Sequence, residues 1–275
     1  MEAIADLHTH TKYSDGILTP EELFSMAEQA GLTAISITDH DSIQGCLIAN
    51  DIKDKYNIDF IPGIEFSCYE GEKEIHMLGY NIDIENKTLH SYIEEFQKAR
   101  FKRAELIINK LNKLGKYITI DEVLLKAGDA PIIRPHIASI LIEKGYVRNW
   151  REAFTEYLGD GSKAYYPKAY FSIPTAIELI NSCHGLSVLA HPARTIEQDL
   201  LYKIIGQGLD GIEVVHPMHD YKLEKYYHEI ANQYLLISTG GSDYHGTRDY
   251  DDVNFGKFTI PYSAVESIRN RTREK

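Results

Sequence analysis

Histidines and carboxylates that could bind a metal ion begin close to the N-terminus of the chain. The stretch ADLHTHTKYSDG, residues 5–16, places His8 and His10 one residue apart and Asp15 five positions after the second histidine. Imidazole and carboxylate groups without thiolates suit zinc, manganese or iron(II). A His-x-His pair is also compatible with a hydrogen-bonded structural role, so the rest of the chain has to decide between the two.

More histidines and carboxylates follow apolar segments that are typical of buried strands. The full set of candidate ligands is His8, His10, Asp15, His40, Glu65, His76, His191, Asp243 and His245. His216 ends a further segment of this kind, GIEVVH. Six histidines and three carboxylates are too many for one ion, and they fit two or three divalent ions with a carboxylate shared between neighbours.

The elements that must position these ligands alternate between strand and helix. The apolar segments are EAIADLH, TAISITDH, IDFIPGIE, SVLAHP, GIEVVHP and LLISTGGSD. Between two of them, TPEELFSMAEQAG has Thr19 and Pro20 as a helix start, Glu22 closing a capping box and Gly31 as a stop. This alternation predicts parallel βα units. In an α/β barrel the carboxyl ends of the strands meet on one face, so we expect the candidate ligands to converge there.

The alternation stops between about residues 89 and 166, where the pattern is helical throughout. The stretch LHSYIEEFQKARFKRAELIINKLNKLG predicts a long amphipathic helix, and TIDEVLLKAG, RPHIASILIEKGY and NWREAFTEYLG predict three shorter ones. We expect residues 1–88 and 167–275 to form the barrel and residues 89–166 to form an all-helical insertion, or cap. Residues 263–275 predict a final helix.

Composition and charge limit the classes of function. The chain has 275 residues, of which 43% are hydrophobic and 25% charged, as in a soluble globular protein. It has no run of about 18 apolar residues and no signal-peptide pattern, so we expect a cytoplasmic protein that does not enter membranes. Three widely spaced cysteines without a C-x-x-C pair indicate neither disulfides nor a thiolate zinc site. The formal net charge of -12 argues against a broad nucleic-acid surface, but not against a small phosphorylated ligand.

Six motifs occur along the chain in the order DLHTHTKYSDG, ITDHDSIQG, IPGIEFS, HMLGY, LAHPAR and GGSDYHG. Together they resemble the successive motifs of the PHP (polymerase and histidinol phosphatase) family over essentially the whole chain. The resemblance implies an α/β fold, a distorted (β/α)7 barrel, with three divalent metal ions (Mn2+, Fe2+ or Zn2+). It implies three groups of ligands: His8, His10, Glu65 and Asp243; His76 and His191 with Glu65 shared; and Asp15, His40 and His245.

The helical insertion resembles one subgroup of that family. RPHIASILIEKGYV followed by YLGDGSKAYYPK is similar to enzymes that remove the 3′-phosphate of nucleoside 3′,5′-bisphosphates or trim short RNA from its 5′ end. By matching motif, Arg134, His136 and Arg194 would hold phosphate, since a guanidinium can give two parallel hydrogen bonds to phosphate oxygens. The lysine of the subgroup is displaced here, and Lys163 or Lys168 would replace it.

We therefore expect a metal-dependent phosphoesterase that uses a metal-bound hydroxide to hydrolyse phosphate esters of small nucleotides or short oligonucleotides. His191 and Asp243 would act at the metal centre, and Arg194 would stabilise the charge that develops on the phosphoryl group. Either His216 or His136 would protonate the leaving alkoxide, although His216 could equally support the site from behind. Long nucleic acid is not an expected partner.

Three alternatives remain at this point. The first is a histidinol-phosphate phosphatase or another small-ester hydrolase, against which the inserted RPH helix argues. The second is a catalytically silent nucleotide- or metal-binding module, which the complete ligand set disfavours. The third is an amidohydrolase-like enzyme acting on C–N bonds, because barrels with histidine and carboxylate metal centres also perform that chemistry. The arginines and the large ligand set favour phosphorus over carbon.

Overall fold

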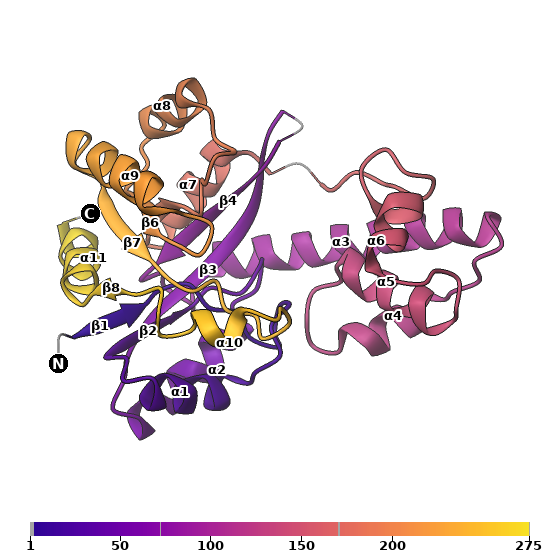
Figure 1. The fold of residues 1–275 in the computed structure, drawn as a ribbon, viewed down its shortest axis with the longest axis horizontal. Coiled ribbons are helices and arrows are strands. Elements are labelled where there is room, and N and C mark those ends of the chain that lie inside the picture. The colour runs from indigo at the N-terminus through magenta and orange to yellow at the C-terminus, as the bar shows by residue number, and fades with distance from the viewer. Residues whose placement is uncertain (1–2, 72, 170, 275) are drawn as a thin grey trace. The chain divides into compact units, whose positions relative to one another are not determined.

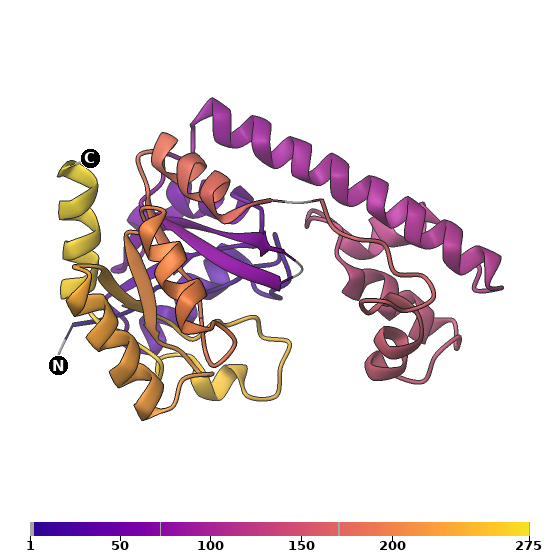
Figure 2. The same ribbon diagram turned by 90° about the horizontal axis from the view of Figure 1, so that it is seen from above.

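The computed structural model describes residues 3–71, 73–169 and 171–274 (Figures 1 and 2). The chain divides into a first unit, Met1–His90 with Phe171–Lys275, and a second unit, Ser91–Tyr170. The first unit contains the sheet and the second is helical. The second unit overlaps residues 89–166, which the sequence predicts to be a helical insertion, and its boundaries lie slightly later in the chain.

An eight-stranded sheet in the order β7-β6-β5-β4-β3-β2-β1-β8 forms the centre of the first unit. Its strands are β1 (Ile4–Asp6), β2 (Ala34–Ile37), β3 (Asp59–Glu70), β4 (Lys73–Tyr80), β5 (Leu186–Leu189), β6 (Gly211–Val215), β7 (Ile237–Gly240) and β8 (Ile260–Pro261). β1, β2 and β3 are parallel, as are β5, β6 and β7. The N–H of Leu7 donates to the carbonyl of Gly240 at 3.1 Å, so β7 returns to β1 and the barrel nearly closes.

The expected α/β barrel of the distorted (β/α)7 type is confirmed, and the distortion has a local cause. β4 is antiparallel to both of its neighbours, β3 and β5. Only a tight turn containing Gly71, at φ +60°, separates the end of β3 from the start of β4. A parallel pair needs a crossover of a dozen or more residues, so this connection allows only a hairpin. The short strand β8, which the sequence did not reveal, pairs antiparallel with β1.

Helices cover the outside of the barrel. They are α1 (Pro20–Gln29), α2 (Gln44–Ile52), the 3-10 turn η1 (Lys53–Lys55), α7 (Ile173–Ser182), α8 (Gln198–Gly206), α9 (Tyr221–Gln233), α10 (Asp251–Asn254) and α11 (Ser263–Glu274). α1 begins as predicted: the N–H of Glu22 donates to Thr19 Oγ1 at 3.2 Å and the N–H of Thr19 donates to the Glu22 carboxylate at 2.8 Å. The barrel interior is filled by small and branched side chains such as Ala5, Ile61 and Val188.

The second unit has its own hydrophobic core. Its helices are α3 (Lys87–Lys113, which begins in the first unit), α4 (Ile120–Ala127), α5 (Arg134–Glu143), α6 (Trp150–Ala153) and the π-helical turn η2 (Phe154–Leu158). Leu111, Val123, Ile137 and Leu141 pack together at the centre of this unit. The four helical segments expected from the sequence are therefore present, the last one as α6 continued by η2. Among the described residues, no helix combines the length and the apolar character that a membrane span requires.

Candidate metal centre

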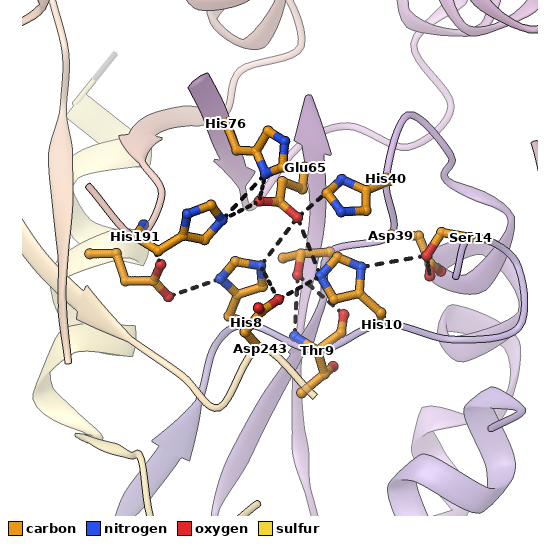
Figure 3. A network of polar contacts seen from close by, with 12 residues as sticks. His8, Thr9, His10, Ser14, Asp39, His40, Glu65, His76, His191 and Asp243 are labelled. Atoms are coloured by element: carbon orange, nitrogen blue, oxygen red, sulfur yellow. Dashed lines mark hydrogen bonds and ion pairs between the residues drawn. The ribbon is translucent and has the colours of Figure 1, made fainter. Parts of the chain in front are cut away.

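The predicted ligands come from segments that continue, or belong to, the strands of the barrel. His8 and His10 directly follow β1, and the alternation of an extended chain directs both side chains to the same side. A parallel bridge between Thr9 and Tyr244 keeps the segments after β1 and β7 in register beyond the strand ends. Imidazoles and carboxylates from distant parts of the sequence thereby meet in one cluster, as Figure 3 shows.

Glu65, on β3, lies at the centre of this cluster with imidazoles around it (Figure 3). Its Oε2 atom lies 3.2–3.3 Å from ring nitrogens of His8, His10 and His40. Its Oε1 atom lies 3.0 Å from His76 Nδ1 and 2.9 Å from His191 Nε2. The two oxygens of one carboxylate therefore face two different sets of histidines, as a carboxylate that bridges two metal ions would.

Asp243 completes a group of four ligand atoms with Glu65, His8 and His10. Its Oδ1 atom lies 3.4 Å from His8 Nε2 and 3.2 Å from His10 Nε2, and the four ligand atoms lie within 4.8 Å of one another. All four residues are buried. Asp243 also has a φ of +53°, a conformation that a non-glycine residue keeps only when tertiary contacts hold it.

Asp15 gathers a second group of four, with His10, His40 and His245. Its Oδ1 atom lies 3.2 Å from His245 Nε2 and 3.6 Å from His10 Nδ1, and its Oδ2 atom lies 3.9 Å from His40 Nε2. The group joins the loop after β1 to the segments after β2 and β7. Nitrogen and oxygen ligands of this kind suit Mn2+, Fe2+ and Zn2+.

Several buried atoms of the cluster make no hydrogen bond within the described chain. They are His10 Nε2, Asp15 Oδ1, His40 Nδ1 and His245 Nε2. A buried polar atom without a partner costs about 1–3 kcal/mol. These atoms have close polar neighbours but not the geometry of hydrogen bonds, so their lone pairs are not directed at one another. Divalent cations would satisfy these atoms, and the residues present therefore fit a metal centre.

The charges of the cluster are strongly coupled. Burial opposes the ionisation of Glu65, but the surrounding imidazoles, His40 first, hold its pKa well below the usual value. Burial also disfavours protonated His10, yet the adjacent carboxylates of Asp243 and Glu65 raise its pKa to about 9. The Glu65 charge raises the pKa of His76, against the effect of burial, to about 10. Burial instead lowers the pKa of His40 to about 4. Without metal, protons on some imidazoles balance the carboxylates, and metal ions would displace those protons.

Glu213, which the sequence analysis missed, supports the cluster from behind. The Nδ1 atom of His8 donates to Glu213 Oε1 at 2.9 Å, and the backbone N–H of His191 donates to Glu213 Oε2 at 2.7 Å. His191 has a φ of +25°. One buried carboxylate therefore orients the ring of one candidate ligand and fixes the strained backbone of another. The available signal was an acidic residue inside the otherwise apolar strand GIEVV.

Two further buried groups hold the loops that carry ligands. Asp39 accepts hydrogen bonds from the N–H of Thr11 at 2.7 Å and from Ser14 Oγ at 2.6 Å, which fixes the loop that leads to Asp15. His219 Nε2 accepts a hydrogen bond from the N–H of Ala193 at 3.0 Å, beside His191. His219 is therefore a structural residue in the described chain.

A cavity of about 500 Å³ opens onto the cluster, a size within the range of small-ligand pockets. It is lined by His40, His76, His191, His216, Pro217, Met218, Asp243, His245, Arg248, Tyr250 and Asn254. His216 is almost fully buried, and its Nε2 atom lies 3.6 Å from Asp243 Oδ2. Arg248 Nη1 lies 3.0 Å from the same oxygen. Arg248 was not predicted as a site residue, although this cation follows the candidate ligand His245 by three residues.

Arg194 is not among the residues that line this cavity in the described part of the chain. Its side chain is 69% exposed, and its guanidinium forms an ion pair with Asp220 at 2.6 Å. The motif LAHPAR thus brings His191 into the cluster and leaves the arginine at the surface.

The other predicted phosphate-binding residues belong to the helical unit. Arg134, at the start of α5, donates to Asp160 at 2.8 Å. Lys163 donates to Glu156 at 2.7 Å, and the N–H of Ile133 donates to His136 Nδ1 at 3.4 Å. Lys168 is half-buried near the end of the same unit. These cations and this imidazole are separated along the chain from the ligand cluster, which lies wholly in the first unit.

Comparison with known proteins places this arrangement in a family. Residues 6–171 match the model of the PHP domain. The chain belongs to the PHP domain family. The matched region contains Asp15, His40, Glu65 and His76 as well as the His-x-His pair, while the ligands after β5 and β7 follow it.

Similar PHP proteins have several activities on phosphate esters. A 5′-3′ exoribonuclease of Haemophilus influenzae is 32% identical over 87% of this chain and 89% of its own. A phosphoribosyl 1,2-cyclic phosphate 1,2-diphosphodiesterase of Eggerthella lenta is 28% identical over 88% and 94%. A 3′,5′-nucleoside bisphosphate phosphatase of Chromobacterium violaceum is 29% identical over 87% and 86%.

A solved structure has the same fold over nearly its whole length. This protein, from Bifidobacterium adolescentis and assigned as a metal-dependent phosphoesterase, superposes with a TM-score of 0.85 at 29% identity. The match covers 97% of this chain and 96% of the other. With its histidine and carboxylate cluster, the present chain is a metal-dependent phosphoesterase of the PHP type, that is, a phosphoric ester hydrolase.

Proposed function

We propose that this PHP phosphoesterase removes the 3′-phosphate of nucleoside 3′,5′-bisphosphates. The observation that carries the proposal is the lining of the cavity, which combines candidate ligand histidines and Arg248 with Met218 and Tyr250. The histidines and the arginine suit a phosphoryl group, whereas Met218 and Tyr250 offer apolar and aromatic surface to the nucleoside. The relative from Chromobacterium violaceum, named for this activity, supports it.

The 5′ end of short RNA is the second candidate substrate. It is favoured by relatives named as 5′-3′ exoribonucleases, among them the one that is 32% identical to this chain. Both substrates place a phosphate ester beside a nucleoside, so one cavity could serve both. The net charge of -12 disfavours long nucleic acid as the physiological ligand.

We propose that three divalent ions occupy the cluster. Glu65, Asp243, His8 and His10 would hold the first, His76 and His191 with Glu65 the second, and Asp15, His40 and His245 the third. When bound, Mn2+, Fe2+ or Zn2+ would supply a nucleophile at neutral pH and neutralise charge on phosphoryl oxygens.

His216 is the proposed proton donor to the leaving alkoxide. The N–H of Met218 donates to His216 Nδ1 at 3.0 Å, so the neutral ring carries its proton on Nε2. That nitrogen makes no hydrogen bond in the described chain and belongs to a residue that lines the cavity. The proton at this atom would move to the leaving oxygen within a hydrogen bond, and a proton from solvent would restore the neutral ring.

Arg134, His136, Lys163 and Lys168 of the helical unit, with Arg194 of the first unit, remain proposed phosphate-binding residues. They rest on the motifs RPHIASIL, GSKAYYPK and LAHPAR. Because carboxylates already neutralise Arg134 and Lys163, a substrate phosphate would have to compete with Asp160 and Glu156. We expect Arg134→Ala to raise KM for the bisphosphate about tenfold with little change in kcat.

The decisive experiment is a substrate panel with manganese-loaded protein. It contains adenosine 3′,5′-bisphosphate, adenosine 5′-monophosphate, a 5′-phosphorylated RNA tetramer, a ribose 1,2-cyclic phosphate and histidinol phosphate. Selective phosphate release from the bisphosphate is expected. Preference for any other member of the panel would replace the proposed substrate, and preference for histidinol phosphate would restore the first alternative from the sequence. Glu229→Gln, an exposed change on α9, is the control variant.

A further inference from the structure

The lining of the cavity contains one permanent cation among the residues that the structure describes, Arg248. Histidines, an aspartate and uncharged side chains make up the remainder. The arginine expected from the LAHPAR motif, Arg194, is largely exposed and paired with Asp220. The cavity therefore has a fixed positive charge that no sequence motif assigned.

The loop that carries Arg248 is held firmly in place. The buried carboxylate of Asp251, at the start of α10, accepts hydrogen bonds from the backbone N–H groups of Thr247 at 3.0 Å and Arg248 at 3.1 Å. The preceding Gly246 has a φ of +74°, and a Cβ atom there would lie 2.5 Å from Ile17. Glycine favours this φ, and together with the Asp251 contacts the turn delivers Arg248 to a defined position.

The guanidinium of Arg248 is only partly used by the protein. Its hydrogen bonds within the described chain run through Nη1, to Asp243 Oδ2 at 3.0 Å and to the Asp243 carbonyl at 3.5 Å. Nη2 and Nε make none there. An arginine has five N–H donors in a planar fork, which matches the oxygens of a phosphoryl group.

The contact with Asp243 fixes where a bound phosphoryl group would lie. Oδ1 of Asp243 faces His8 and His10, whereas Oδ2 faces Arg248 and His216. The guanidinium is thus one carboxylate away from the first ligand group. A phosphoryl group beside the metal centre would be within reach of the unused donors.

We propose that Arg248 binds the phosphoryl group that is cleaved, as a substrate-binding residue additional to the metal ligands. The proposal rests on the proposed function only in that a phosphate ester occupies this cavity, and it applies to any such ester. Arg248 opposes the charge that builds up on the non-bridging oxygens during cleavage, and it selects for an anionic phosphoryl group over a neutral one.

Binding of inorganic phosphate, the product common to phosphomonoesters, tests this directly. Equilibrium dialysis of radiolabelled phosphate against manganese-loaded protein compares the wild type with Arg248→Ala, Arg248→Lys and the exposed control Lys225→Ala. We expect Arg248→Ala to weaken binding roughly 10- to 100-fold, Arg248→Lys to weaken it less, and Lys225→Ala to leave it unchanged. Manganese content, measured on the same samples, should stay at the wild-type level in all variants.

Three outcomes would overturn the proposal. If manganese content falls in parallel with phosphate affinity, Arg248 only positions Asp243. If phosphate binds equally well to the wild type and Arg248→Ala, or fails to bind the wild type at all, Arg248 is not a phosphate ligand. Failure of the proposed substrate would look different, because the wild type would still bind phosphate through Arg248 while leaving the nucleoside bisphosphate intact. Added guanidinium should partly restore phosphate binding to Arg248→Ala and leave phosphate binding by the control unchanged.

Discussion

The metal cluster of the barrel and the predicted phosphate-binding cations of the helical unit hold their charges in opposite ways. In the barrel, Glu65, His8 and His10 are buried, and His10 Nε2 makes no hydrogen bond within the described residues. In the helical unit, Arg134 and Lys163 have carboxylate partners at 2.8 and 2.7 Å. The barrel cluster is incomplete without a cation, whereas these two cations are already neutralised. Buried ligand atoms without hydrogen-bond partners therefore indicate a metal centre, while exposed ion pairs do not by themselves indicate a binding site.

Removing the charge at the centre of the barrel cluster should have the largest effect. We expect Glu65→Gln to lower phosphoesterase kcat on the order of 10³-fold or more, because the amide loses the negative charge that both sets of histidines face. Metal content by mass spectrometry should drop as well. An active variant with full metal content would show that Glu65 does not bridge.

Glu213→Gln should lower activity less than Glu65→Gln does, and it should do so by weakening metal binding. The amide preserves the shape of the side chain but changes the charge and one acceptor that orient His8 and His191, and such supporting residues are typically worth 10- to 100-fold in metal affinity or activity. A chelator competition assay measures the affinity. Unchanged affinity together with a lowered melting temperature would assign Glu213 a purely structural role.

The affinity for metal should keep rising with pH above neutrality. The pKa values of His10 and His76 are raised to about 9 and about 10, compared with 6.5 for an unperturbed histidine, so a metal ion must displace their protons. The affinity should rise about tenfold per pH unit for each proton displaced and level off only near those values. Chelator competition between pH 6 and 9 measures it. A plateau above pH 7 would contradict this coupling.

The smallest expected effect compares the same local feature in both units. Thr19 in the barrel and Thr119 in the helical unit each begin a helix with a complete capping box. Thr119→Ala should lower the free energy of unfolding by about 1 kcal/mol and leave metal affinity unchanged. Denaturant titration with metal analysis checks both statements. A loss of metal in Thr119→Ala, and not in Thr19→Ala, would mean that the helical unit supports the metal centre.

The residues of the metal cluster could be selected from the sequence because their signal is local. Each follows or lies on an apolar strand, and parallel strands end on one face of a barrel. The helix start at Thr19 was equally legible, since capping depends on residues three positions apart, and Thr119 begins a helix with the same motif. The sequence alone thus predicted the barrel, the helical segments after residue 88 and the pool of metal-ligand candidates.

Only the tertiary structure decided which groups support the site. Glu213 reaches His8 across 205 positions of sequence, and nothing near it in the chain indicates that contact. Arg194 and Arg248 each lie three residues after a candidate ligand, yet one pairs with Asp220 at the surface and the other lines the cavity. The direction of a long side chain depends on the partner that folding offers it, which is Asp220 for Arg194 and Asp243 for Arg248. Local pattern therefore determined the candidate ligands, and long-range packing decided which side chains surround them.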